Sequence, residues 1–253
     1  MSSRTTHGPA STGETPAVRP PAGALRAVDW ERVAADLDAA GAARIEGLLG
    51  SAECEALAGL FPGEEGFRKT VVMERHGFGS GEYKYFRYPL PDLVQELRTA
   101  VYPHLAAVAN RWNERMGIDV RFPADHAAFL ERCHAAGQVK PTPLLLRYGA
   151  GDYNRLHQDL YGEHVFPLQL TILLSRPGED FEGGEFVLTE QRPRMQSRPE
   201  VVQLRQGDAV IFAVHQRPLR GAHGDTRANM RHGVSRIRSG RRHTLGIIFH
   251  DAG

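Results

Sequence analysis

The pattern of hydrophobic and polar positions changes near residue 140. Beyond it, short apolar or alternating runs are separated by Gly, Pro and polar turns; they are PLLLRY, HVFPLQLTILL, GGEFVL, DAVIFAV and HTLGIIF. Runs of this length that end at turn residues are typical of β-strands. Because many such strands follow one another, the pattern predicts an antiparallel barrel or jelly roll over 140–253.

Residues 26–139 contain the longer apolar period of helices, interrupted by a few strands. The expected elements are a helix capped by Asp29, a strand at 42–45, a helix capped by Ser51, strands at 70–74 and 83–88, a helix from Pro91 through Trp112 bent near Pro103, and a helix at about 124–135. The sequence therefore predicts an α+β chain of mainly β structure. An α-rich N-terminal lobe backs the β core, and the two form one integrated domain.

Composition narrows the class of protein. Residues 1–25 carry few large apolar side chains and are expected to be a disordered tail. The chain is 41% hydrophobic and 24% charged with a net charge of +1, which gives no whole-chain case for a dedicated nucleic-acid binder. Cys54 and Cys133 are too few for a disulfide framework and are expected to be reduced. With no apolar signal core and no membrane-length apolar stretch, a cytoplasmic location is expected.

A histidine and a carboxylate two residues apart point to a metal site. Residues i and i+2 of a strand face the same side, so His157 and Asp159 can reach one ion. The alternative is a surface histidine beside a solvated aspartate. A second His-x-Asp, His223–Asp225, is followed by only a short arginine-rich segment, whereas a barrel's length of strand-like sequence follows His157. The context favours the first pair.

The third ligand is expected from a later strand. The candidates are His215, His223, His232, His243 and His250. His232 is favoured because a turn at Ser239-Gly240 would return the following strand beside it, with Arg242 at that strand's start. His215 and His223 are interpreted as loop residues and His250 as a residue near a ragged C-terminus.

Arg242 is the candidate for binding a carboxylate deep in the barrel. A guanidinium grips a carboxylate through two parallel hydrogen bonds, and two histidines with one carboxylate leave three coordination positions of Fe(II) open. The alternative for Arg242 is a solvated loop arginine, and Arg241 takes its place if the strand register slips by one.

The order HQD, HGV and an arginine ten residues later resembles the 2-oxoglutarate/Fe(II)-dependent dioxygenase superfamily, including its prolyl hydroxylase-like branch. The likeness covers about residues 140–250. It implies a double-stranded β-helix core, Fe(II) bound by His157, Asp159 and His232, and 2-oxoglutarate bound through Arg242. Tyr148 stands where relatives often hydrogen-bond 2-oxoglutarate, although a core tyrosine fits the sequence equally well. Catalytic residues beyond these ligands are not required.

A second resemblance concerns the substrate. RYGAG followed by LHQD is similar to the AlkB-like nucleic-acid repair demethylases, but Leu146 stands where those enzymes usually have asparagine, and their later arginine pair is not reproduced. Over most of its length the chain also resembles little-studied bacterial oxygenases that end in GRRxTLGIIFHDA and are associated with oxidative demethylation of damaged nucleic acid. Residues 217–242 contain eight arginines and one acid, Asp225, and such a local charge would attract anions, either 2-oxoglutarate or the phosphates of a nucleic acid. The alternative is a solvated basic loop.

The resemblance implies hydroxylation of a substrate C–H bond while 2-oxoglutarate and O₂ become succinate and CO₂. The substrate is open: an amino acid, peptide or other small molecule is as compatible as damaged nucleic acid. Two other classes stay open, a cupin-like metalloenzyme that does not use 2-oxoglutarate and a non-catalytic binding module. Gly183 and Gly184 in DFEGGEF are expected to permit a bulge or a close backbone approach.

Overall fold

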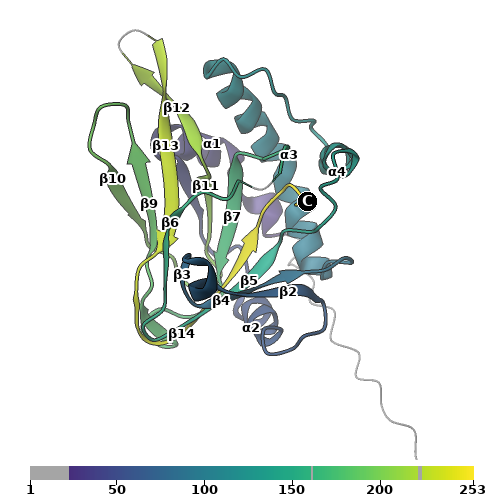
Figure 1. The fold of residues 1–253 in the computed structure, drawn as a ribbon, viewed down its shortest axis with the longest axis vertical. Helices are drawn as coiled ribbons and strands as arrows, with labels where there is room; N and C mark the ends of the chain where they lie inside the picture. The colour runs from purple at the N-terminus through teal and green to yellow at the C-terminus, as the bar shows by residue number, and fades with distance from the viewer. Residues whose placement is uncertain (1–22, 161, 222–223) are drawn as a thin grey trace, which may run out of the picture.

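The protein, seen in a computed structural model, consists of two antiparallel sheets packed face to face, with helices covering the outer face of the larger sheet (Figure 1). The structure describes residues 23–160, 162–221 and 224–253. Most of the expected tail and the expected loop residue His223 lie outside the described residues. The helices are α1 Trp30–Ala40, α2 Ser51–Gly59, α3 Asp92–Arg115 and α4 His126–Ala135, with short 3₁₀ turns at Leu25–Ala27 and Met73–His76.

The larger sheet places strands from both halves of the chain side by side. In spatial order its strands are β1 Ala42–Ile45, β11 Ala209–Ala213, β7 Leu168–Leu173, β14 Ile237–Ile247, β5 Leu144–Gly149, β4 Glu82–Phe86 and β2 Phe67–Val72, with β8 Phe181–Gly183 beside β14. The smaller sheet has the order β10 Arg198–Val202, β9 Phe186–Gln191, β13 Gly224–Val234, β6 Tyr153–His157 and β3 Gly79–Ser80, with β12 Gln216–Gly221 beside β13.

Strand alternation divides the apolar residues between two cores. On β7, Leu168, Leu170 and Ile172 face the helices and belong to the larger core. The intervening Gln169 and Thr171 face the space between the sheets. A strand with both faces covered reads as a nearly continuous apolar run, which is why HVFPLQLTILL lacks a regular polar alternation.

Local capping signals explain the helix boundaries. The Asp29 carboxylate accepts a hydrogen bond from the Arg32 amide at 2.9 Å, as the sequence predicts. The prediction for Ser51 is wrong: Gly50 occupies the N-cap position, and the Ser51 hydroxyl donates to Gln206 Oε1 at 3.0 Å instead. An extended backbone at Gly50 already starts the helix, so Ser51 is its first residue.

One strand boundary and the C-terminus also differ from expectation. The predicted strand at 70–74 ends at Val72, because the chain turns into a 3₁₀ helix at Met73–His76. His250 is fully buried rather than ragged, and its Nδ1 accepts a hydrogen bond from the Phe166 amide at 3.2 Å. The C-terminal residues are therefore packed against the body of the protein.

Candidate metal and cosubstrate site

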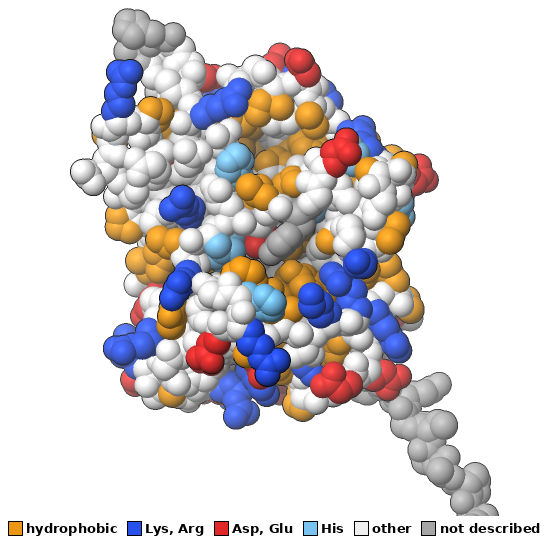
Figure 2. All heavy atoms as spheres, in the orientation of Figure 1, with side chains coloured by type: hydrophobic (Ala, Val, Ile, Leu, Met, Phe, Trp, Pro, Cys, Tyr) orange, Lys and Arg blue, Asp and Glu red, His pale blue; other side chains and the backbone are white. Residues whose placement is uncertain are grey.

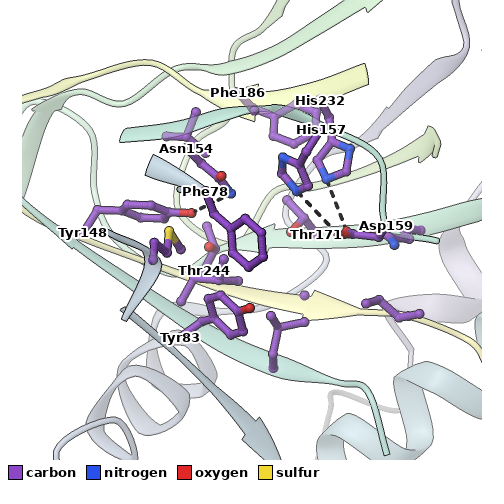
Figure 3. Close-up of a pocket in the computed structure, with 18 of the residues that line it drawn as sticks. Phe78, Tyr83, Tyr148, Asn154, His157, Asp159, Thr171, Phe186, His232 and Thr244 are labelled. Atoms are coloured by element: carbon purple, nitrogen blue, oxygen red, sulfur yellow. Dashed lines mark hydrogen bonds and ion pairs between the residues drawn. The ribbon is translucent and has the colours of Figure 1, made fainter. Parts of the chain in front are cut away.

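His157 and His232 of the smaller sheet and Asp159 of the loop after β6 converge on one point (Figure 3). His157 ends β6, and His232 lies directly opposite it on β13. Asp159 Oδ1 is 3.5 Å from His157 Nε2, and Asp159 Oδ2 is 3.4 Å from His232 Nε2. Adjacent ligands about 2.1 Å from an octahedral ion lie about 3 Å apart, so these atoms are spaced to share one ion. The three residues form the cluster that could hold a metal among the described residues.

The route by which Asp159 reaches His157 differs from the prediction. Asp159 lies two residues beyond the end of β6, so the pleat of a strand does not align the two side chains. Within β6, a β-bulge places Asn154 and His157 on the same face, since His232 pairs with His157 while Val234 pairs with Asn154. Both of these β6 residues line the cavity.

Hydrogen bonding and burial set the state of the two imidazoles. His157 Nδ1 lies 2.7 Å from the Arg155 carbonyl oxygen, which leaves Nε2 as the ligand atom when Nδ1 carries the proton. His232 is 7% exposed and packs 4.6 Å from the Phe212 ring centroid. Burial lowers the pKa of His232, and a neutral imidazole is the form that binds a metal. Burial therefore favours the metal-binding form of the His232 ring, and the Arg155 carbonyl orients the His157 ring.

Arg242 lies in the larger sheet at 2% exposure. Among the described residues, its Nε and Nη1 atoms have no hydrogen-bond partner. Burial lowers its pKa to about 10, so the guanidinium still carries its charge at neutral pH. A buried cation without a bound anion is costly, and a carboxylate would satisfy the unpaired nitrogens. Arg241 is exposed, so the strand register presents Arg242 and not its neighbour.

The strand arrangement that brings Arg242 to the cavity also differs from the prediction. Ser239 and Gly240 lie within β14 rather than at a turn, and the chain reverses before Ile237. β13 and β14 are in opposite sheets, so Arg242 faces His232 across the cavity instead of lying on a neighbouring strand. Gly184 leaves room for the Arg242 side chain, because a Cβ there would lie 2.9 Å from Arg242 Cδ. The expected close backbone approach is at Gly183, where a Cβ would lie 2.4 Å from the Arg236 carbonyl oxygen.

Tyr148 lies beside Arg242, with the guanidinium carbon 5.7 Å from its ring centroid. The tyrosine is fully buried, and burial raises its pKa to about 12, so the hydroxyl stays protonated. Asn154 donates a hydrogen bond to the Tyr148 oxygen at 3.3 Å, which leaves the phenol proton available to an acceptor in the cavity (Figure 3). Asn154 is not recognisable from the sequence, because the bulge that aligns it with His157 leaves no regular strand spacing.

A cavity of about 200 Å³ joins the metal cluster to Arg242. The residues of its wall that sequence reasoning missed include Phe78, Asn154, Gln169, Thr171 and Thr244. The sequence contains a signal for two of these wall residues, because Gln169 and Thr171 are polar positions within an otherwise apolar strand. Phe78 is 46% exposed at the cavity and stacks on His76 with ring centroids 5.4 Å apart.

The arginines between 217 and 242 do not form one patch. Arg217 is fully buried and paired with Glu190, and Arg242 is in the cavity. Arg220 and Arg227 are exposed on the β12–β13 hairpin, Arg231 is exposed further along β13, and Arg236, Arg238 and Arg241 are exposed just before β14 or in its first half. Figure 2 shows histidine and acidic side chains in a hollow near the centre of this face, with hydrophobic and basic side chains around it.

The family match defines the class: the protein is an oxygenase, and therefore an oxidoreductase. Within that class, the chain belongs to the Oxygenase-NA family, described as an oxygenase catalysing oxidative methylation of damaged DNA, which it matches over residues 81–252. The predicted oxygenase class is thereby confirmed, and the predicted double-stranded β-helix is confirmed by the solved structures that share this fold.

One relative and two solved structures are similar to this chain. An uncharacterized protein of Mycobacterium tuberculosis (strain CDC 1551 / Oshkosh) is 48% identical over 167 residues, which are 66% of this chain and 72% of the relative. A Trichoplax adhaerens prolyl hydroxylase, solved with a hypoxia inducible factor peptide, shares the fold at a TM-score of 0.52 and 13% identity, covering 88% of each chain. A Phytophthora capsici prolyl 4-hydroxylase gives 0.52 and 17%, covering 92% of this chain and 68% of that one.

The described helices include none whose length and apolar character would suffice to cross a bilayer.

Proposed function

We propose that His157, Asp159 and His232 hold Fe(II), and that Arg242 and Tyr148 bind 2-oxoglutarate for hydroxylation of a substrate C–H bond. The observation that carries the proposal is a two-histidine, one-carboxylate cluster that shares a cavity with a buried, unpaired guanidinium. This donor set suits Fe(II) and leaves coordination positions for a chelating cosubstrate. A cupin-like enzyme without 2-oxoglutarate has no use for Arg242 in this position.

Each residue has a separate task. When bound, Fe(II) and 2-oxoglutarate would supply the chemistry that activates O₂ for the hydroxylation, with succinate and CO₂ as the other products. Arg242 neutralises and orients the distal carboxylate of 2-oxoglutarate, and the Tyr148 hydroxyl donates a hydrogen bond to it. The Arg155 carbonyl holds the His157 ring, and Phe212 covers the His232 ring and keeps water from it. Proton transfer by a further side chain is not required.

The metal assignment is tested by replacing one histidine and a matched control. His232→Ala is expected to lose stoichiometric Fe(II) and substantially all succinate formation from 2-oxoglutarate. His215→Ala changes a loop histidine outside the cavity wall and is expected to retain both. Anaerobic metal titration and succinate release measure the two effects. Retention of full metal binding by His232→Ala would remove this residue from the ligand set.

We propose further that the substrate is an N-methylated base in single-stranded nucleic acid. The family description names damaged DNA. An exposed aromatic ring at the cavity suits a planar substrate, because every base can stack on a ring. Exposed arginines on the β12–β13 hairpin can contact phosphates close to His232. Hydroxylation of an N-methyl carbon gives an unstable N-hydroxymethyl group that releases formaldehyde and the repaired base.

Salt dependence tests the nucleic-acid substrate. Arg231 is exposed and next to His232 in sequence, so Arg231→Gln is expected to weaken single-strand binding and reduce the salt slope by about one. Arg238→Gln is the matched control, because it changes an exposed arginine on β14 rather than on the strand that carries His232. Fluorescence anisotropy of a labelled oligonucleotide over a salt series measures both slopes. Equal slopes for the two variants would contradict the proposed contact.

A further inference from the structure

Gln169 is a buried polar residue that takes no part in the proposed metal and cosubstrate contacts. It lies on β7, is 4% exposed and lines the cavity. Its Nε2 atom is buried and donates to nothing in the part of the chain that the structure describes. A buried donor left unpaired costs about 1–3 kcal/mol, so such a group in a cavity wall indicates a ligand that satisfies it.

Strand register places Gln169 at the other end of the cavity from Arg242. Arg242, Thr244 and Gly246 of β14 line the cavity with Ile248, the residue after the strand, because every second residue faces inward. Gly246 pairs with Thr171 of β7, so Gln169 lies one inward step further, level with Ile248. From Arg242 to Ile248 the backbone rises about 20 Å, at about 3.3 Å per residue.

The cosubstrate does not extend this far. A five-carbon diacid spans roughly 6 Å at about 1.5 Å per bond, so 2-oxoglutarate that reaches from Arg242 toward the metal leaves the Gln169 end uncovered. Gln169 nevertheless stays close to the metal cluster. Its cross-strand partner on β11 is Phe212, whose ring packs 4.6 Å from the His232 ring. The substrate is the remaining ligand for this end of the cavity.

We infer that Gln169 hydrogen-bonds the substrate base and contributes to its selection. This inference rests on the proposed nucleic-acid substrate. A primary carboxamide presents an N–H donor beside a carbonyl acceptor. It can therefore form two hydrogen bonds with a base edge that has an acceptor beside a donor. Adenine has this pair in N7 and N6, and methylation at N1 leaves both free, whereas cytosine offers only its N4 donor on the corresponding edge. The structure assigns Gln169 a preference for a methylated adenine.

The test compares two single-stranded oligonucleotides of one sequence, carrying either N1-methyladenine or N3-methylcytosine. Gln169→Leu removes both the donor and the acceptor at nearly constant size. A lost bidentate base contact is worth about 1–3 kcal/mol, so kcat/KM for the adenine substrate should fall by roughly 5- to 150-fold. The value for the cytosine substrate should change much less. Gln95→Leu, on the exposed side of α3, is the matched control and should change neither.

Binding measurements separate substrate selection from folding. The Gln169→Leu protein, loaded with Mn(II) and 2-oxoglutarate so that no turnover occurs, should bind the methyladenine oligonucleotide more weakly by the same factor. Its affinity for 2-oxoglutarate should match that of the wild type. Equal losses on both oligonucleotides, or no loss, would overturn the inference while leaving the nucleic-acid substrate intact. If the wild type demethylates neither base, the proposed substrate fails and the inference fails with it.

Discussion

Replacing Gly233 by alanine probes how the bulge in β6 holds His157. An ideal Cβ at Gly233 would lie 2.7 Å from the Asn154 carbonyl oxygen and 3.2 Å from the Arg155 carbonyl oxygen. Both atoms are backbone, and ordinary contact begins at 3.4 Å, so β6 must move by about 0.7 Å. The Arg155 carbonyl is also the atom that lies 2.7 Å from His157 Nδ1. The extra methyl group therefore displaces the support of a proposed metal ligand.

The expected effect on stability is the balance of two terms. Gly→Ala stabilises a protein by about 0.4–1 kcal/mol where the backbone conformation allows it, and Gly233 has no positive φ. Forcing atoms into a packed region costs about 1–3 kcal/mol. We expect Gly233→Ala to be destabilised by about 1–2 kcal/mol and to lose about 10- to 100-fold in metal affinity, the usual effect of disturbing a group that supports a ligand.

Mn(II) titration without 2-oxoglutarate and urea unfolding measure the two quantities. Gly246→Ala is the matched control, because a Cβ on this strand glycine meets Leu144 Cδ2 at 2.8 Å, and a side-chain end can rotate away. The control is expected to keep metal affinity near the wild-type value. A Gly233→Ala protein that binds Mn(II) as tightly as the wild type and resists urea better would refute the role assigned to the bulge.

Three other predictions concern the cavity and the core. Arg242→Met should raise the melting temperature of the cosubstrate-free protein, because it removes a buried unpaired charge. It should also abolish the rise in melting temperature on adding 2-oxoglutarate. A retained rise would contradict the role of Arg242 in binding 2-oxoglutarate. Phe78→Ala should weaken binding of a single-stranded oligonucleotide by about 1–3 kcal/mol while Phe78→Trp retains it, and equal affinities in anisotropy would argue against stacking. Burial lowers the pKa of His126 and of His250 to about 4, below the ordinary 6.5. As pH drops, these two histidines therefore take up protons in the unfolded chain before they do so in the folded protein. The free energy of unfolding should fall as pH drops from about 6.5 to 4. Urea midpoints that stay constant across this range would contradict it.

Local sequence signals determined the elements and the ligand types. Asp29 starts α1 because its carboxylate accepts a hydrogen bond from an amide three residues away, an interaction that depends on neighbouring residues alone. Short strands and turn residues similarly predicted the jelly roll after residue 140. The residue types His157, Asp159 and His232 were readable because a metal restricts which side chains can bind it.

Tertiary structure decided how these residues meet. Arg242 reaches the cavity from the opposite sheet, and its position depends on which strands pair, a long-range choice that no local signal encodes. The bulge that aligns Asn154 with His157 exists only where β6 pairs with β13 at Gly233. Pairing and packing also buried Arg217 and left Arg231 exposed, although the two arginines look equivalent in the sequence. Burial depends on what the rest of the chain places against a residue, and only the folded structure supplies that.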